Sequence, residues 1–113
     1  VSEGSTLSMT YVTGDNSKVE SMSLPRKALK PDSKVILIDD FMRGGGTLKG
    51  MKDLMHEFGA KVIGTGVFIS TTKPQQKMVE DYISLIELDD NGETTIAKPN
   101  FKRFKDEYRE LQF

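Results

Sequence analysis

Two carboxylates and three glycines stand close together in the segment VILIDDFMRGGGT, which spans residues 35–47. Asp39 and Asp40 follow four aliphatic residues, and the Gly44–Gly46 run directly precedes Thr47. Glycines let backbone N–H groups approach a phosphate, and a helix N-terminus favours its negative charge. Adjacent carboxylates suit hydroxyl donors or a metal ion instead. Acids beside a phosphate loop therefore predict a phosphorylated sugar as the ligand.

An uninterrupted aliphatic run must place these groups at one edge of a sheet. Residues 35–38 contain no polar break, which favours a strand that is buried on both faces of a parallel sheet. Ligands of such sheets bind at the carboxyl ends of strands, and both acids would lie just past this strand. Thr47 is the predicted N-cap of the following helix, and Gly59 is predicted to end it. Apolar residues repeat at helical spacing between them, at Leu48, Met51, Leu54, Met55 and Phe58.

The remaining segments predict hairpins and a second parallel strand. Ahead of the acid pair, alternating residues 7–12 and a strand at 18–24 flank a turn signal. After the helix, residues 62–69 would complete a strand–helix–strand crossover. Later elements are predicted as a short helix at 78–82, a hairpin formed by strands 83–88 and 94–97, and a terminal helix at 101–113 with an aromatic stripe.

The segment 35–47 resembles the phosphoribosyl-pyrophosphate (PRPP) binding motif of type I phosphoribosyltransferases. In that motif, four apolar residues and two acids precede a short Gly/Thr-rich loop. The resemblance extends to the effector domain of the purine operon repressor of Gram-positive bacteria, which is similar to a phosphoribosyltransferase fused to a DNA-binding winged-helix domain. The segments that carry it are EGSTLSMTYV (3–12), SMSLPRKALK (21–30), VILIDDFMRGGGTLKGM (35–51), EFGAKVIGTGV (57–67) and NFKRF (100–104).

This resemblance implies an α/β chain with the type I phosphoribosyltransferase fold, in which helices flank a parallel sheet and an antiparallel flexible hairpin is attached. Residues 1–113 would be the C-terminal portion of a PRPP-binding effector domain. The chain starts at Val1 without an initiator Met, and we expect the winged-helix domain and the pyrophosphate loop to lie upstream. The acid pair would contact the ribose hydroxyls, and the loop would hold the 5′-phosphate. The implied PRPP-binding residues are Asp39, Asp40, Phe41, Met42, Arg43, Gly44, Gly45, Gly46 and Thr47.

Two functions follow from this resemblance. In the first, the chain is a catalytically inactive sensor in a homodimeric repressor of purine biosynthesis genes. PRPP binding then releases the repressor from its operator DNA. PRPP is then an effector, with Mg²⁺ as its companion ion, and no cofactor is required. In the second, the chain is part of an active purine phosphoribosyltransferase. Phe41 and Arg43 are bulkier than the small residues common in the enzymes, and Gly44 stands where many carry a hydroxyl. These departures favour binding over turnover.

Composition narrows the remaining classes of protein. The 113 residues suffice for one domain, although a hydrophobic share of 36% is low for a self-sufficient globule. The net charge of −1 argues against a nucleic-acid-binding domain within this chain. There is no cysteine, which fits the cytoplasm, and no apolar stretch approaches the length of a membrane span. We expect a cytoplasmic protein without a membrane partner.

Two further features of the sequence give weaker indications of function. The segment VILIDD followed by Lys73-Pro74 also suggests the receiver domain of a response regulator. That fold needs an Asp at the end of a middle strand, and the predicted strand 62–69 ends without one. His56 has no second His or Cys as a partner and is predicted to be an exposed helix residue.

Overall fold

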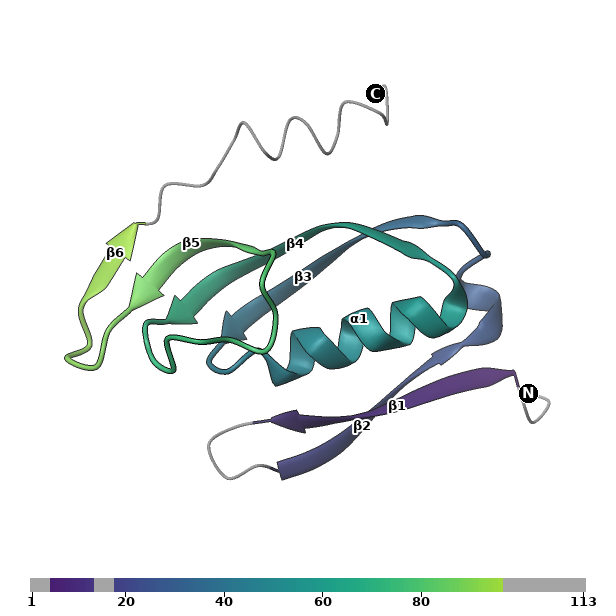
Figure 1. Ribbon diagram of the computed structural model, residues 1–113, viewed down its shortest axis with the longest axis horizontal. Helices are drawn as coiled ribbons and strands as arrows, with labels where there is room; N and C mark the ends of the chain where they lie inside the picture. Colours follow the sequence, from purple (N-terminus) through teal and green to yellow (C-terminus); the bar gives the residue numbers. More distant parts are fainter. Residues whose placement is uncertain (1–4, 14–17, 97–113) are drawn as a thin grey trace, which may run out of the picture.

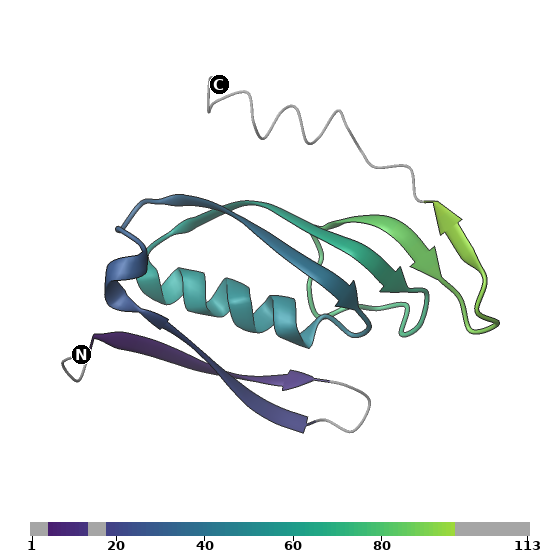
Figure 2. The ribbon, with the colours of Figure 1, turned by 180° about the vertical axis from the view of Figure 1, so that it is seen from behind.

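The computed structural model of the chain describes residues 5–13 and 18–96. Its layers are a four-stranded sheet, a helix on one face of that sheet, and a two-stranded hairpin on the far side of the helix (Figure 1). The view from behind shows the same order of layers (Figure 2). The elements are β1 (Thr6–Thr13), β2 (Lys18–Pro25), the 3-10 helix η1 (Arg26–Ala28), β3 (Lys34–Met42), α1 (Gly46–Phe58), β4 (Lys61–Thr71), β5 (Ile83–Leu88) and β6 (Thr94–Ile96).

The predicted hairpin is confirmed as the antiparallel pair β1–β2. Strand alternation gives it one apolar face, because successive side chains point to opposite sides. Leu7 is paired with Leu24, and Met9 with Met22, so these four side chains lie together. All four are partly buried against the core that α1 shares with the sheet. The hairpin is therefore held to α1 by apolar contact.

The sheet has the strand order β3-β4-β5-β6 and is mixed. β3, β4 and β5 run parallel, and β6 returns antiparallel to β5. The predicted crossover is confirmed as β3–α1–β4, and the predicted second hairpin is confirmed as β5–β6 up to Ile96. The end of that strand at residue 97 and the predicted helix at 101–113 lie outside the described residues. Because the parallel strands share a direction, the loops after β3 and β4 meet at one edge.

Helix α1 forms the centre of the core. Leu48 is completely buried, and Leu54, Met55 and Phe58 are buried with it on the side that faces the sheet. Complete burial of a leucine side chain contributes about 1.5–3 kcal/mol. Gly59 ends the helix in the left-handed region, with φ 74°, and its N–H donates to the His56 carbonyl at 3.0 Å. The prediction for Gly59 is thus confirmed.

The start of α1 differs from the prediction. The helix begins at Gly46, with Gly45 at the N-cap in the left-handed region (φ 92°), and no side chain caps it. Thr47 is therefore inside the first turn, and the prediction that it is the N-cap is wrong. Gly45 has taken that position because its missing Cβ allows the positive φ that brings the loop into the helix. His56 is exposed, as predicted.

β3 is longer and less buried than predicted. The pairing with β4 continues through Phe41 and Met42, so both acids lie within the strand rather than past it. Only the face that packs on α1 is covered by described residues. On the other face Ile36 and Ile38 are 46% and 59% exposed. The prediction of a strand buried on both faces is therefore wrong for the part of the chain described here.

The predicted helix at residues 78–82 is also wrong. Residues 72–82 form an irregular connection between β4 and β5. The Met78 N–H donates to the Gly44 carbonyl at 2.8 Å, and the Val79 side chain is buried. These long-range contacts replace the local hydrogen bonds that a helix would need. The connection thereby packs against the glycine loop.

Candidate functional site

A pocket of about 190 Å³ opens at the carboxyl end of β3. Every residue that the sequence predicted for the ligand lines it, except Asp40. Two further residues join the lining, namely Thr13 from the tip of the hairpin and Leu48 from α1. The complete lining is Thr13, Asp39, Phe41, Met42, Arg43, Gly44, Gly45, Gly46, Thr47 and Leu48. The fold thus brings an acid, a glycine loop and a helix start into one cavity.

The helix start supplies hydrogen-bond donors to this pocket. The first helical bond within α1 runs from the Lys49 N–H to the Gly45 carbonyl, at 2.9 Å. The N–H groups of the preceding helical residues, Gly46–Leu48, have no intrahelical acceptor, as in any helix. No side chain caps them. The partial positive charge of a helix N-terminus therefore lies at a wall of the pocket, where it suits an anion.

The acid pair divides into one pocket carboxylate and one exposed neighbour. Asp39 is half-buried and lines the pocket, whereas Asp40 is exposed. The Asp40 N–H donates to Asp39 Oδ1 at 2.9 Å. Burial raises the pKa of Asp39 above its ordinary value, and the neighbouring Asp40 carboxylate raises it further. The ionised Asp39 is an acceptor for hydroxyl donors and lies in the same pocket as the helix N-terminus.

Phe41 and Arg43 form a second wall. The Arg43 guanidinium lies over the Phe41 ring, with 5.8 Å from its central carbon to the ring centroid. A cation over an aromatic face is attracted by the negative electrostatic potential of that face. The pair therefore adds a positive charge and an aromatic surface to the pocket lining.

The hairpin is fitted to α1 through two glycines. A Cβ at Gly46 would overlap the carbonyl oxygen of Val12. A Cβ at Gly50 would lie 2.7 Å from the Tyr11 Cβ and 3.3 Å from the end of Met22. Both helix positions thus need glycine because β1 approaches the helix backbone directly. This approach brings Thr13 to the pocket, which no sequence pattern indicates beyond the turn signal that follows it.

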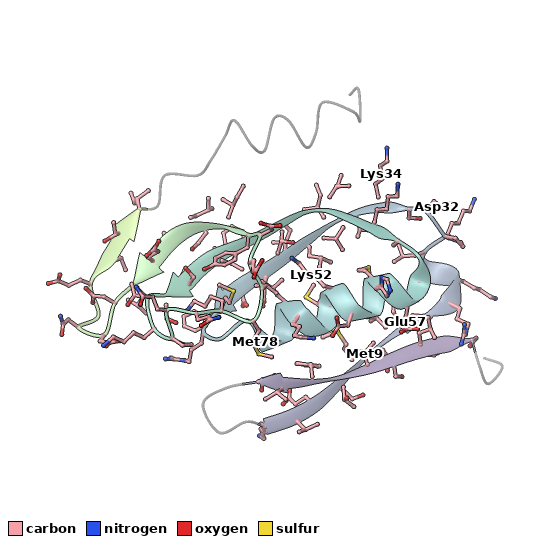
Figure 3. All side chains as sticks on the ribbon, viewed as in Figure 1. Met9, Asp32, Lys34, Lys52, Glu57 and Met78 are labelled. Atoms are coloured by element: carbon pink, nitrogen blue, oxygen red, sulfur yellow. The ribbon has the colours of Figure 1, made fainter. Side chains whose placement is uncertain are left out.

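The connection after β4 is hydrogen-bonded to the backbone of the glycine loop. Lys77 Nζ donates to the Arg43 carbonyl at 2.5 Å and to the Thr71 carbonyl at 2.7 Å. Met78 lies at the N-terminal end of α1 (Figure 3). The residue types at 71–77 predict no more than a polar loop. No local pattern distinguishes Lys77 from a solvated lysine, because its partners are 34 and 6 residues away.

The described residues offer little to a metal ion on their own. They contain no group of three or more His, Cys, Asp or Glu side chains that could hold one. The Asp39–Asp40 pair fits a hard cation such as Mg²⁺ only if a bound ligand supplies further oxygens. Within the same residues, no helix is long and apolar enough to cross a membrane.

Comparison with known proteins decides the family. The model of the phosphoribosyl transferase domain matches residues 2–99. The chain belongs to this family. The phosphoribosyl transferase match includes the whole acid–glycine segment and both hairpins as far as they are described.

Among curated phosphoribosyl transferase relatives, regulators of purine biosynthesis are prominent, which confirms the resemblance seen in the sequence. The purine biosynthesis transcriptional repressor of Bacillus subtilis (strain 168) is 40% identical over 108 residues, or 92% of this chain and 38% of the relative. The purine biosynthesis transcriptional activator of Lactococcus lactis (strain IL1403) is 38% identical over 89 residues, or 79% of this chain and 33% of the relative. The chain thus spans about a third of the length of these relatives.

Solved structures confirm the type I phosphoribosyltransferase fold. The adenine phosphoribosyltransferase of Thermoanaerobacter pseudethanolicus superposes with a TM-score of 0.63 at 26% identity. The alignment covers 74% of this chain and 49% of that enzyme. The chain therefore forms part of a phosphoribosyl transferase domain, as predicted.

Proposed function

We propose that this chain is the PRPP-sensing part of a cytoplasmic transcriptional repressor of purine biosynthesis genes. The observation that carries the proposal is that Asp39 and the uncapped N-terminus of α1 line the same pocket. One group suits sugar hydroxyls and the other suits a phosphate, and PRPP carries both. The similarity to regulators of purine biosynthesis supports the regulatory reading over an enzymatic one.

Within this proposal each wall of the pocket has a role. Asp39 accepts hydrogen bonds from the ribose hydroxyls, with Asp40 beside it. The backbone N–H groups of the Gly44–Gly46 loop and of Thr47 hold the 5′-phosphate. Phe41, Met42 and Arg43 shape the wall between these two subsites. A Mg²⁺ ion would be held mainly by ligand oxygens, because the chain contributes only the adjacent carboxylates.

Regulation requires that PRPP distinguish two states of the whole protein. A ligand shifts an equilibrium only by the difference between its affinities for the two states. PRPP must therefore bind the conformation with low DNA affinity better than the DNA-bound one, and DNA must weaken PRPP binding by the same factor. Residues 1–113 would be the C-terminal portion of the effector domain. Operator DNA would be bound by an upstream winged-helix domain of a homodimer.

The experiment is a gel shift of full-length protein on operator DNA, with and without PRPP. Asp39→Ala combined with Asp40→Ala should bind DNA normally but should no longer be released by PRPP. Asp53→Ala is a matched control, because Asp53 is a half-buried acid of α1 that pairs with Lys49 outside the pocket. Release of the double variant at the wild-type PRPP concentration would contradict the assignment.

The second candidate is an active purine phosphoribosyltransferase, favoured by the fold shared with adenine phosphoribosyltransferase. Turnover needs a base held in line with the anomeric carbon and a stabilised pyrophosphate leaving group. Phe41 and Arg43 occupy the pocket wall where the enzymes favour small residues, which supports a sensor without catalysis. Full-length protein should form no nucleotide from PRPP, Mg²⁺ and adenine, guanine or xanthine. Nucleotide formation well above the uncatalysed rate would establish the enzyme instead.

A further inference from the structure

Lys77 connects the glycine loop to the end of β4 and is not among the residues that line the pocket. Its Nζ lies 2.5 Å from the Arg43 carbonyl, 2.7 Å from the Thr71 carbonyl and 3.4 Å from Thr71 Oγ1. The next residue adds a backbone bond, from the Met78 N–H to the Gly44 carbonyl at 2.8 Å. Two consecutive carbonyls of the loop are therefore held by residues 77 and 78.

Because these two carbonyl groups are held, the directions of the N–H groups that follow them are fixed as well. In a trans peptide unit the C=O and the following N–H point in opposite directions. With the Arg43 carbonyl directed at Lys77, the Gly44 N–H points away from Lys77. With the Gly44 carbonyl directed at Met78, the Gly45 N–H likewise points away. Gly44 and Gly45 line the pocket, and none of the lining residues belongs to the 72–79 connection.

We propose that Lys77 is a positioning residue for the phosphate subsite, which holds the Gly44 and Gly45 N–H groups toward the pocket without touching the ligand. The inference rests on the proposed function, because it names how that site recognises a 5′-phosphate. Preorganised donors bind an anion more tightly, since the loop loses less freedom when the ligand arrives. Lys77 also adds a positive charge close behind the loop.

The surroundings of Lys77 agree with a structural grip rather than a solvated charge. Burial lowers the pKa of Lys77 below its ordinary value, and the nearby Arg43 charge lowers it further, whereas Glu87 opposes this shift. The hydrogen bonds from Lys77 to the Arg43 and Thr71 carbonyls offset part of this burial cost. Lys73 of the same connection offers the contrast, because its Nζ pairs at 3.0 Å with Asp90 at the surface and the pair is largely exposed.

The test measures the affinity of full-length protein for PRPP, ribose 5-phosphate and inorganic phosphate by calorimetry. Lys77→Met should weaken binding of all three by about tenfold, the effect of one charged hydrogen bond. Lys77→Arg should restore most of the affinity, because guanidinium can donate to both carbonyls. Lys73→Met is the matched control and should bind like wild type. Thermal unfolding identifies variants that do not fold, and Lys77→Gln then replaces Lys77→Met.

The outcomes separate this inference from the proposed function. Folded Lys77→Met or Lys77→Gln with wild-type affinities would overturn the role of Lys77 while leaving PRPP sensing intact. If wild-type protein binds inorganic phosphate but not PRPP, and Lys77→Met weakens the phosphate binding, the role of Lys77 stands and PRPP sensing is overturned. Wild-type protein that binds none of the three ligands would overturn both. Loss in Lys77→Met that Lys77→Arg does not restore would indicate a packing role and would also overturn the inference.

Discussion

Asp39 is a residue whose charge the fold tolerates at the expense of stability. Burial and the neighbouring Asp40 raise its pKa in the folded state. A folded-state pKa above the unfolded value means that the native state binds the proton more tightly. The stabilisation from this group is therefore complete at low pH and is lost as the pH rises through the raised pKa. At neutral pH the ionised Asp39 weakens the unliganded fold, and a hydroxyl-bearing ligand offsets that effect.

Asp39→Asn should accordingly separate stability from binding. The free energy of unfolding at pH 7 should rise, by less than about 1 kcal/mol because water screens the half-exposed carboxylate. Affinity for PRPP should fall, because an amide is a poorer acceptor for two hydroxyls. Near about pH 3, where both states protonate the aspartate, the stability difference should vanish. Urea unfolding at the two pH values measures this, and an equal gain at both would point to a cause other than charge.

Gly44 and Gly45 of the loop are constrained differently, so substitutions at these two positions should have different effects. A Cβ at Gly44 would meet nothing within 4 Å, whereas Gly45 has a φ of 92° and a Cβ there would lie 3.3 Å from the Met78 nitrogen. Gly44→Ser should therefore fold normally and tighten PRPP binding several-fold, by adding a hydroxyl donor near the phosphate. Gly45→Ser should weaken binding, because a side chain at positive φ is strained. Calorimetry on both variants is the measurement, and equal losses would place the phosphate elsewhere.

At the scale of elements, the hairpin and α1 act as one unit because β1 lies against the helix backbone. Gly50→Ala puts a methyl group 2.7 Å from the Tyr11 Cβ, so one of the two elements must move. Overpacking of this kind costs about 1–3 kcal/mol, which exceeds the ~1 kcal/mol that alanine gains over glycine in a helix. We expect a net loss of stability in thermal unfolding. Tyr11→Gly in the same chain should recover part of it, and a purely additive result would contradict the contact.

The elements themselves were largely predictable from the sequence, because periodicity reports which face is buried. Strands, helix and the end of the helix at Gly59 follow from local pattern. The residues predicted for the ligand all line the pocket except Asp40, whereas Thr13 and Leu48 line it without having been predicted there. Two of the failed predictions share one cause, because the contacts and conformation of the glycine loop override the local pattern. The helix expected at 78–82 does not form, because the Met78 N–H donates to the Gly44 carbonyl instead. Thr47 is not the N-cap, because Gly45 takes that position with its left-handed conformation. The role proposed for Lys77 could not be predicted from the sequence either, since its hydrogen-bond partners are set by the tertiary fold.

The described residues as a whole leave the sheet covered on one face. Opposite α1, the open face presents Ile36, Ile38, Phe68 and Leu85, and Phe68 is 54% exposed. Exposed apolar patches of this kind mark surfaces that contact another part of the protein or another molecule. Stability must therefore depend mainly on the side of the sheet that packs on α1.

Paired truncations should reveal this asymmetry. Leu48→Ala removes a completely buried side chain and should cost about 2–5 kcal/mol in urea unfolding of this chain. Phe68→Ala on the open face should change stability by no more than about 1 kcal/mol. A loss at Phe68 as large as that at Leu48 would mean that a segment outside the described residues, or a second copy, covers the open face.

The contact between Gly46 and Val12 has a consequence for genetics. The atom that excludes a side chain at Gly46 is the backbone carbonyl of Val12, which every amino acid at position 12 would retain. A selection for restored function should therefore find no compensating change at position 12 for any Gly46 variant. At Gly50 the nearest obstacle is the Tyr11 Cβ, which only glycine at position 11 would remove, so a second-site suppressor at position 11 should be glycine. Two glycines one helical turn apart thus differ in whether a mutation at them can be reversed from elsewhere in the chain.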